Sequence, residues 1–418
     1  MGWIVEKAKD NQLTLKVNNV YIYSKYKPLE DVKRLINTLP ESDFYVVLGL
    51  GLGYHLLALK ERYPNAHIYG ISIDKEDKNV FDKHGLIEVK NNKEISIVNQ
   101  LNQIEFDYIR EENLVIPMQW TKALGEDHAL TPFIEDIKLR QMSRDSYQDY
   151  LDKNFEFSSM LNDMQVTSLK NKFDSKVACL VSSGPSLDHT IEQLKECKNK
   201  AFILAVSSCL KILEANNIKP DAIIISDAKP WVKNHFNGTS CTAPLFYLAT
   251  ASKEAVENYS GKRIKLFQKG YTPSEKEALH TNAPLFDVGG SVATLGFSLL
   301  NYLGFSKIIL FGQDLGFTNE KTHASNAGSG VKLSQPFKYK QILANDGSYI
   351  NISKSLYTYW RWFDKHVPLS KAKVYNTALK GSKISEAEYI TEDKLIDMLI
   401  EARYEDFNKL LEKQGEIK

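Results

Sequence analysis

The feature that most constrains the fold is the stretch of residues 285–324, LFDVGGSVATLGFSLLNYLGFSKIILFGQDLGFTNEKTHA. An apolar, β-branched segment ends at Gly289 and Gly290, and Ser291 then stands at the N-cap of a helix whose leucines recur at helical spacing. A second apolar strand, residues 307–312, follows that helix. The pattern is typical of an open α/β sheet, in which ligands bind where strands end and helices begin.

Polar residues follow the second of these strands at its carboxyl end. They are Gln313, Asp314, Thr318 and His323. We expect the ends of the two strands to point their polar groups at one place, which is the predicted active site. Asp314 and His323 are the acid–base candidates, because a loop imidazole with an ordinary pKa near 6.5 suits proton transfer at neutral pH. The alternative is an ordinary loop histidine with no catalytic role.

The alternation of strands and helices along the 418 residues predicts an α/β protein with two separate cores. An N-terminal Rossmann-like domain is expected over residues 1–130 and a helical connector over residues 131–172. A larger Rossmann-like α/β domain, with a parallel sheet of about seven strands covered on both faces, is expected over residues 173–384. A charged helical segment, residues 385–418, ends the chain.

The N-terminal domain contains a glycine-rich turn. The apolar strand of residues 44–48 leads into Gly49, Gly51 and Gly53, and a second strand ends near Asp74. This pattern matches a nucleotide-binding or S-adenosylmethionine-binding loop with an acidic residue for a ribose. The alternative is that the glycines only permit a tight turn and close packing of helix on strand.

The larger domain opens with its own glycine turn, VSSGPSLD. Gly184 lets a ligand approach the backbone, and Pro185 fixes the turn. Ser183 and Ser186 add hydroxyl groups beside a helix N-terminus. The combination suits a diphosphate or a phosphodiester, and the alternative is an ordinary capped turn between strand and helix.

Further polar groups follow the next strands of this domain. Ser208 ends one apolar strand, and Asp227 ends the following one. The carboxylate of Asp227 suits a ribose or sugar hydroxyl or a magnesium ion, and the alternative is that it caps the next helix. In the aromatic helix of residues 357–366 most side chains suit a core, whereas Tyr359 and Arg361 are candidates to face the cleft.

Composition excludes several classes of partner. The chain has 53 basic and 52 acidic residues and a net charge of +1, so we expect neither a nucleic-acid nor a membrane partner. Its four cysteines lie far apart without metal-ligand spacing, as in a protein of a reducing compartment. The N-terminus has no apolar leader, and no segment approaches the roughly 20 apolar residues of a membrane span. We therefore expect a cytoplasmic protein.

Taken in order, the motifs resemble the motility accessory factor (Maf) family of flagellin glycosyltransferases. The resemblance rests on SSGPSL (residues 182–187), ISDA (225–228), GGSVATLGFSLLNYLGFSKIILFGQDLGFT (289–318) with KTHA (321–324), and VYNTALKGSKI (374–384). It implies transfer of a nonulosonic acid, such as a pseudaminic, legionaminic or related 3-deoxy acid sugar, from a CMP-activated donor to Ser or Thr hydroxyls of flagellin. It also implies a catalytic domain similar to bacterial sialyltransferases, of GT-A type.

The same resemblance implies roles for individual residues. His323 is the general base of an inverting displacement, with Asp314 beside it. The CMP donor is held by Ser183, Gly184, Pro185, Ser186, Ser208, Asp227, Gly289, Gly290, Ser291, Gln313, Thr318 and Asn376. In VYNTALKGSKI the sequence departs from the family pattern around Asn376, where a second glycine is usual.

The absence of an Asp-x-Asp pair at a strand end fits a transferase that requires no metal, although Mg²⁺ remains an option. Three other interpretations stay open. The catalytic domain also looks like that of archaeal 6-hydroxymethylpterin diphosphokinases, which would need ATP and Mg²⁺ held by Asp227 and Asp314. The N-terminal domain could be a methyltransferase, or the protein could be a flagellin assembly factor without enzymatic activity.

Overall fold

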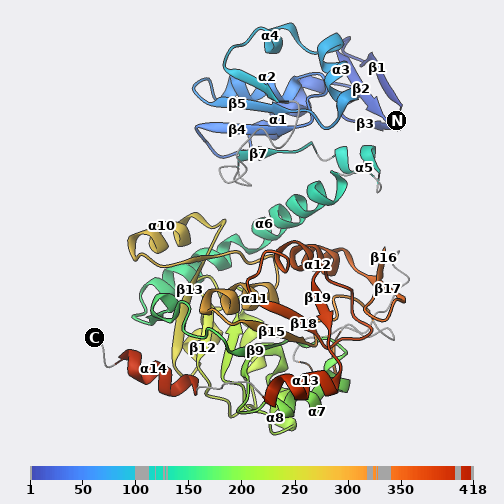
Figure 1. Cartoon of the computed structure of the whole chain (residues 1–418). Helices are drawn as coiled ribbons and strands as arrows, with labels where there is room; N and C mark the ends of the chain where they lie inside the picture. Colours follow the sequence, from blue (N-terminus) through green and yellow to red (C-terminus); the bar gives the residue numbers. More distant parts are fainter. Residues whose placement is uncertain are drawn as a thin grey trace. The chain divides into compact units, whose positions relative to one another are not determined.

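The chain forms two compact α/β units, which confirms the predicted fold class (Figure 1). Unit 1 is Met1–Asp145 and unit 2 is Ser146–Lys418, so the division falls inside the long helix α6 (Thr131–Ser159). The boundaries expected near residues 130 and 172 stay predictions. The computed structural model describes residues 2–98, 113–117, 119–125, 128, 130–317, 323–325, 327, 340–400 and 406–415, without the side chains of 132–133, 135–146 and 413–415.

Unit 1 is built on a four-stranded parallel sheet with the order β6-β5-β4-β7. Strand β4 (Phe44–Leu48), one of the two inner strands, has the sequence FYVVL, and its last four residues are buried, as expected of a strand covered on both faces. A three-stranded antiparallel sheet, β1-β2-β3, precedes it. The strands are β1 (Trp3–Lys7), β2 (Leu13–Val17), β3 (Val20–Tyr21), β4 (Phe44–Leu48), β5 (His67–Ile71), β6 (Ile95–Val98) and β7 (Leu114–Val115). The helices are α1 (Pro28–Ile36), α2 (Tyr54–Arg62), α3 (Lys75–His84), α4 (Ile87–Lys90) and α5 (Trp120–Leu124).

Unit 2 is built on a ten-stranded sheet in which every recorded pairing is parallel. The order is β14-β13-β12-β11-β10-β9-β15-β18-β19, and β8 pairs with β13. The prediction of about seven strands was too low, because short strands extend the sheet at its margins. The strands are β8 (Met164–Gln165), β9 (Val177–Val181), β10 (Phe202–Val206), β11 (Ala222–Ile225), β12 (Leu245–Leu248), β13 (Arg263–Gln268), β14 (Leu285–Phe286), β15 (Lys307–Phe311), β18 (Lys373–Asn376) and β19 (Ala387–Tyr389).

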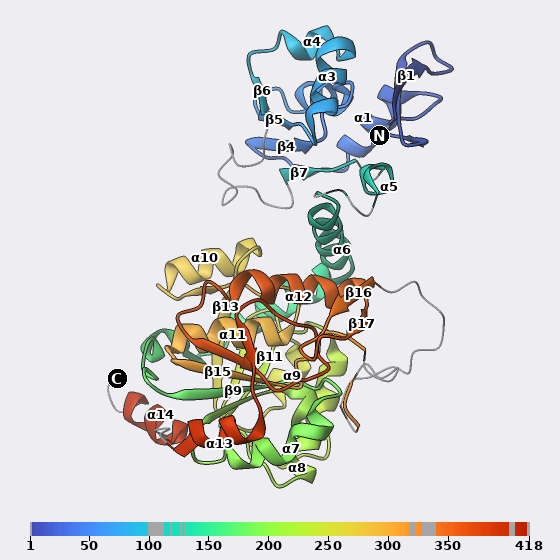
Figure 2. The same ribbon diagram turned by 45° about the vertical axis from the view of Figure 1, so that its right-hand side comes forward.

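Helices cover both faces of this sheet. Figures 1 and 2 show α7, α8 and α13 on one face and α11 and α12 on the other. The buried strands therefore read as continuous apolar runs, such as VACLV in β9 and FILAV in β10. The helices are α7 (Leu187–Glu196), α8 (Leu210–Ala215), α9 (Lys253–Glu257), α10 (Thr272–His280), α11 (Val292–Leu303), α12 (Lys354–His366), α13 (Glu392–Ile400) and α14 (Phe407–Gly415), with 3₁₀ turns η4 (Val166–Leu169), η5 (Ser207–Cys209) and η6 (Pro230–His235). A hairpin of β16 (Lys340–Leu343) and β17 (Tyr349–Ile352) precedes α12.

The strand order corrects one expectation about the stretch of residues 285–324. Its two strands do not lie side by side: β14 is at the sheet edge, whereas β15 lies beyond β9, with five strands between them. The chain builds the sheet outward from β9 to β14 and then returns across it through α11, which packs on β9, β10 and β11. The polar groups after β14 and β15 therefore reach the carboxyl edge of the sheet at separate points.

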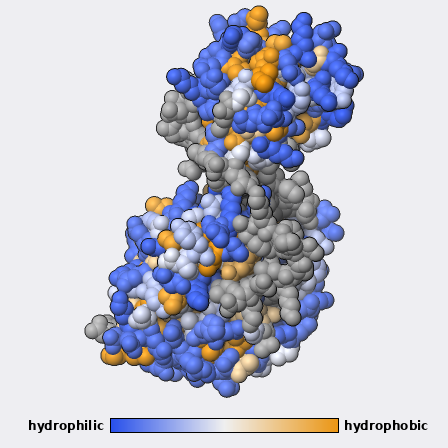
Figure 3. Space-filling model, turned by 90° about the vertical axis from the view of Figure 1, so that its right-hand side faces the viewer, coloured by the Kyte–Doolittle hydropathy of each residue, from blue (hydrophilic) through white to orange (hydrophobic). Residues whose placement is uncertain are grey.

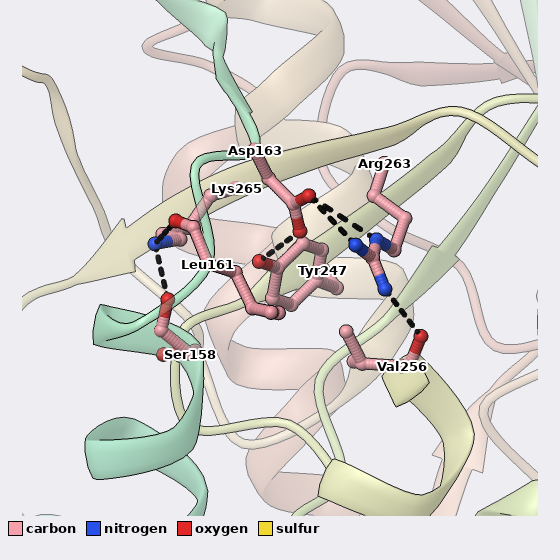
Figure 4. A network of polar contacts seen from close by, with 7 residues as sticks. All are labelled: Ser158, Leu161, Asp163, Tyr247, Val256, Arg263 and Lys265. Carbon is pink, nitrogen blue, oxygen red and sulfur yellow. Dashed lines mark hydrogen bonds and ion pairs between the residues drawn. The ribbon is translucent and has the colours of Figure 1, made fainter. Parts of the chain in front are cut away.

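A polar network fixes the end of α6 and the segment after it to the sheet of unit 2 (Figure 4). The carboxylate of Asp163 accepts hydrogen bonds from the Tyr247 hydroxyl (2.7 Å) and from Nε and Nη2 of Arg263 (3.2 and 3.0 Å). The ammonium group of Lys265 donates to the carbonyl oxygens of Ser158 and Leu161. Burial lowers the pKa of Lys265. Buried charges that are paired in this way hold a segment in one geometry.

Within the described residues, no helix is both long and apolar enough to cross a membrane. Figure 3 shows a face on which hydrophobic residues form small groups among hydrophilic ones. The most exposed large apolar side chains, such as Leu279 in α10 and Leu369 after α12, belong to separate elements. Apolar residues scattered in this way are ordinary for a protein surface.

Candidate active site

The direction of strand order reverses between β9 and β15. The chain adds β10 to β14 on one side of β9, and β15, β18 and β19 on the other. In open parallel sheets, ligands bind at the carboxyl ends of the strands beside such a reversal, because the loops that leave neighbouring strands there diverge to opposite faces. The turn after β9 and the segment after β15 meet at this point.

The glycine turn after β9 is locked to the segment after β15. The N–H of Gly184 donates to the carbonyl of Gly312 (2.9 Å). A Cβ atom on Gly184 would lie less than 3.0 Å from both that carbonyl oxygen and the carboxylate of Asp314, so only glycine fits. The Asp314 carboxylate accepts the N–H of Ser186 (3.0 Å to Oδ1) and the Ser186 hydroxyl (2.8 Å to Oδ2). The turn and its neighbour thus close on each other through a carboxylate.

Gln313 and Asp314 are both buried at this junction. The Ser182 hydroxyl donates to Oε1 of Gln313 (2.7 Å), which ties the ends of β9 and β15 together a second time. Burial raises the pKa of Asp314 to about 6, and the hydrogen bonds from Ser186 oppose that rise. Asp314 can therefore change its protonation state near neutral pH, although its oxygens already bind Ser186.

Two serines and an aspartate line the ends of β9, β10 and β11. The hydroxyls of Ser183 and Ser208 lie 2.9 Å apart. Asp227, one position after Ser226 at the end of β11, accepts the N–H of Lys229 (3.0 Å). Burial raises its pKa. Three neighbouring strands thus end in polar side chains, and their role in ligand binding stays a prediction.

The segment of His323 lies against the same strand end. The N–H of Ala324 donates to the carbonyl of Ser183 (2.8 Å), and Ser325 donates through its N–H and hydroxyl to the carboxylate of Asp188 in α7 (3.0 and 2.9 Å). His323 is therefore one residue from a direct contact with the glycine turn, on the same edge of the sheet. Burial lowers the pKa of His323, which keeps the imidazole neutral at neutral pH.

The second glycine turn stands at the N-terminus of α11. Ser291 caps this helix: its hydroxyl accepts the N–H of Thr294 (3.2 Å), and the Thr294 hydroxyl accepts the N–H of Ser291 in return (3.3 Å). A Cβ on Gly289 would collide with Trp362, and one on Gly290 would lie 3.0 Å from the Tyr359 ring. Residues of α12 thus cover the turn, as the sequence predicts for Tyr359.

Burial is the main cause that raises the pKa of Tyr359, and the charges of Tyr147 and Asp227 raise it further. In the strand order Asp227 follows β11, on one side of β9, whereas Asp314 follows β15, on the other side.

Asn376 at the end of β18 is fully buried, and its Oδ1 accepts the N–H of Ala378 (3.0 Å), whereas its Nδ2 has no hydrogen-bond partner. Its role in donor binding stays a prediction. Thr318 lies outside the described residues. Among the described residues, no group of three or more His, Cys, Asp or Glu side chains has the arrangement of a metal site.

The glycine turn of unit 1 is filled by the chain itself. The buried carboxylate of Asp77 accepts the N–H groups of Leu50 (2.8 Å), Gly51 (2.8 Å) and Ile73 (3.0 Å). Side chains of Tyr23, Trp120 and Phe81 occupy the space that a Cβ on each glycine would need. The donors that would bind a phosphate in a nucleotide loop are used internally, which favours the interpretation that these glycines only serve packing.

Sequence reasoning missed a cavity of about 490 Å³ beside the β9–β15 junction. Side chains at helical spacing on α7, His189, Thr190 and Gln193, form one wall, and Lys380 and Tyr389 stand on the other. The available signal was one polar residue, Thr190, between the buried Leu187 and Leu194 of α7, because the packed face of a helix is usually apolar.

Comparison with known proteins agrees with this architecture. A family model described as 6-hydroxymethylpterin diphosphokinase MptE-like matches residues 154–320. An uncharacterized protein of Treponema pallidum (strain Nichols) is 29% identical over 165 residues, which are 38% of this chain and 36% of that protein. A ribosomal RNA small subunit methyltransferase H of Nautilia profundicola is 26% identical over 182 residues, 43% of this chain and 52% of that protein. The chain thus spans about a third to a half of these curated relatives.

A solved structure, that of a Maf glycosyltransferase from Magnetospirillum magneticum AMB-1, is similar over 94% of this chain and 70% of its own, with a TM-score of 0.51 and 17% identity. Both units are needed to reach that coverage, since unit 2 alone is shorter. The chain therefore has the fold of a Maf glycosyltransferase over almost its whole length, which confirms at the level of the fold the resemblance carried by its motifs.

Proposed function

We propose that the chain is a cytoplasmic glycosyltransferase that moves a nonulosonic acid from a CMP-activated donor to Ser or Thr hydroxyls of flagellin. The fold shared with a Maf glycosyltransferase supports the general activity. The ordered motifs of unit 2, which resemble that family, support the donor and the acceptor.

One observation carries the proposal: the hydrogen bond from Ala324 N–H to the carbonyl of Ser183. It holds the residue next to His323 at the strand end that carries Ser183 and Ser208, and burial lowers the pKa of His323, as a neutral base requires. A base and a set of groups that bind hydroxyls are needed together at one edge of the sheet for transfer to an alcohol.

The donor site of this proposal uses three strand ends and one helix N-terminus. The ribose hydroxyls and the phosphate oxygens of CMP are bound by Ser183, Ser208 and Asp227. The N–H groups of Val292 and Ala293 in the first turn of α11 face the phosphate or the sugar carboxylate, since a helix N-terminus favours an anion. The turn after β9 is kept in place by positioning residues, which are Gly184, Pro185, Ser186, Gln313 and Asp314.

The reaction is an inverting displacement. The acceptor oxygen forms a bond to the anomeric carbon as His323 takes its proton, and the bond from that carbon to the phosphate oxygen breaks, so CMP leaves with the electron pair. Donors fixed around the leaving phosphate stabilise its charge. We propose that no metal is required, because CMP carries one phosphate, and EDTA should then leave the rate unchanged.

Transfer is tested by incubating the purified protein with flagellin and a CMP-activated nonulosonic acid and measuring the intact mass of flagellin. A gain equal to one or more sugar residues is expected. His323→Ala should lower kcat by about 10²-fold or more with CMP affinity retained, as expected for a general base. His280→Ala, at the exposed end of α10, is the matched control. Full turnover by His323→Ala would remove the imidazole from the mechanism.

A second candidate is an ATP-dependent diphosphokinase, which the family model over residues 154–320 favours. That enzyme would require Mg²⁺ on Asp227 and Asp314, and Asp314 would have to give up its bonds to Ser186. Titration calorimetry with CMP, with ATP and Mg²⁺, and with S-adenosylmethionine separates the transferase, kinase and methyltransferase hypotheses. Flagellin that binds without gaining mass would indicate an assembly factor.

A further inference from the structure

The cavity beside the β9–β15 junction lies next to the β9 turn, whose Pro185 and Ser186 also line it. Its volume is about 490 Å³, within the range of ligand-binding sites. One wall is a stripe of α7 with His189, Thr190 and Gln193, and the opposite wall is formed by Thr377 and Lys380 after β18 and by Tyr389 at the end of β19. The nucleotide groups Ser208 and Asp227 follow β10 and β11, on the other side of β9.

The lining of the cavity contains both hydrogen-bond acceptors and hydrogen-bond donors. Oε1 of Gln193 is buried and has no hydrogen-bond partner, and Asp314 also lines the cavity. Lys380 and His189 supply donors. The hydroxyls of the two lining threonines already donate to backbone carbonyl oxygens. An anionic sugar would meet the Asp314 carboxylate, whereas a peptide segment brings both N–H and C=O groups and suits both walls.

The cavity also touches the segment of His323. Asp188 lines it, and the same carboxylate binds the N–H and hydroxyl of Ser325, two residues after His323. The segment that carries His323 is therefore held at the cavity through Asp188, a residue of the lining.

We infer that this cavity binds the acceptor: a hydroxyl-bearing peptide segment that places its Ser or Thr at His323. The inference rests on the proposed function, since it names the acceptor subsite of the same transferase. Gln193 and Lys380 are its specificity-determining residues, and neither contacts the donor.

The test uses the full chain with Gln193→Met and Lys380→Met, and with Lys198→Met, an exposed lysine beyond the end of α7, as the matched control. Each cavity variant should raise KM for flagellin about tenfold, the loss of one hydrogen bond to a polar or charged partner, with the Kd for CMP unchanged. Because the Gln193 oxygen has no partner in the free protein, Gln193→Met should melt no lower than the wild type. Lys198→Met should behave as the wild type.

Hydrogen–deuterium exchange with flagellin alone, without donor, gives an independent readout. Slower exchange over residues 186–193 and 377–389 is expected, and CMP alone should protect the ends of β10 and β11 instead. An unchanged KM for flagellin in both variants, or a raised KM for the donor alone, overturns the inference and leaves the transferase standing. If the wild type transfers no sugar, the proposed function fails, and the exchange pattern with flagellin still decides whether the cavity binds peptide.

Discussion

Gly184→Ala is the substitution that most directly tests how the glycine turn is held. The added Cβ would lie less than 3.0 Å from the carbonyl oxygen of Gly312 and from the carboxylate of Asp314. Neither neighbour is free to move, because Gly312 accepts the N–H of Gly184 and Asp314 accepts two hydrogen bonds from Ser186.

The cost can be worked out from these contacts. Forcing a methyl group into a filled position costs about 1–3 kcal/mol. Losing one hydrogen bond to a charged group adds roughly 1.5–3 kcal/mol. We therefore expect Gly184→Ala to destabilise unit 2 by about 2.5–6 kcal/mol. In a double-mutant cycle with Asp314→Ala the two costs should fall short of additivity by about 1 kcal/mol or more, because removing the carboxylate removes one of the two collisions.

Native-state hydrogen exchange of the β9 amides measures this free energy within unit 2 alone, which avoids treating two units as one transition. A loss of less than about 1 kcal/mol for Gly184→Ala would contradict the collision argument. Additivity of the two substitutions within about 0.5 kcal/mol would show that Asp314 is not what the methyl group meets.

Three further predictions follow from buried charges. The rate of transfer should be retained as the pH falls to 6.5 and be lost only below it, because burial lowers the pKa of His323 and the base must be neutral. A midpoint at or above pH 6.5 in the pH–rate profile would contradict His323 as the base. Burial raises the pKa of Asp77 from 3.8 to about 6, so the folded state holds this proton more tightly than the unfolded state. Unit 1 should therefore lose up to about 3 kcal/mol of stability as the pH rises from 4 to 6, measured by amide exchange of β4 at increasing urea concentration. Asp77→Asn should flatten this dependence of stability on pH, and an unchanged dependence would contradict the assignment. Asp163→Asn should destabilise unit 2 by about 3 kcal/mol, because the contacts of Asp163 with Arg263 and Tyr247 are weakened. Glu196→Gln, in an exposed ion pair, should change the free energy of unfolding little. Equal effects of the two substitutions in urea unfolding would contradict a stabilising role for the network.

The glycine turns after β4 and β9 are closed in the same way. In unit 1 Asp77 occupies the backbone N–H groups of the turn, and in unit 2 Asp314 occupies that of Ser186. A carboxylate supplied by the chain takes the place where a phosphate binds in nucleotide loops. In unit 1 this closes the turn, whereas in unit 2 the serine hydroxyls at the ends of β9 and β10 remain beside the segment of His323.

Several elements could be predicted from the sequence because their signals are local. The apolar run at β9 and the cap at Ser291 define a strand and a helix start, and the helix ends at Gly304 with φ near 91°, a conformation that glycine adopts without strain. The motifs of unit 2 likewise predicted the fold that the Maf structure shares. Nearby residues along the chain suffice for such inferences.

Which strands are neighbours, and which side chains therefore meet, follows from the three-dimensional fold. Nothing in the sequence places β15 next to β9 and β14 at the far edge, because each strand is apolar on both faces and would pair with any other. The bonds of Asp314 to Ser186, 128 residues apart, and the cavity between α7 and β19 follow from that order. Local sequence patterns define the helices and strands and the polar groups at their ends. Long-range pairing of the strands determines which of those groups meet, because pairing depends on the whole buried sheet and on no single segment.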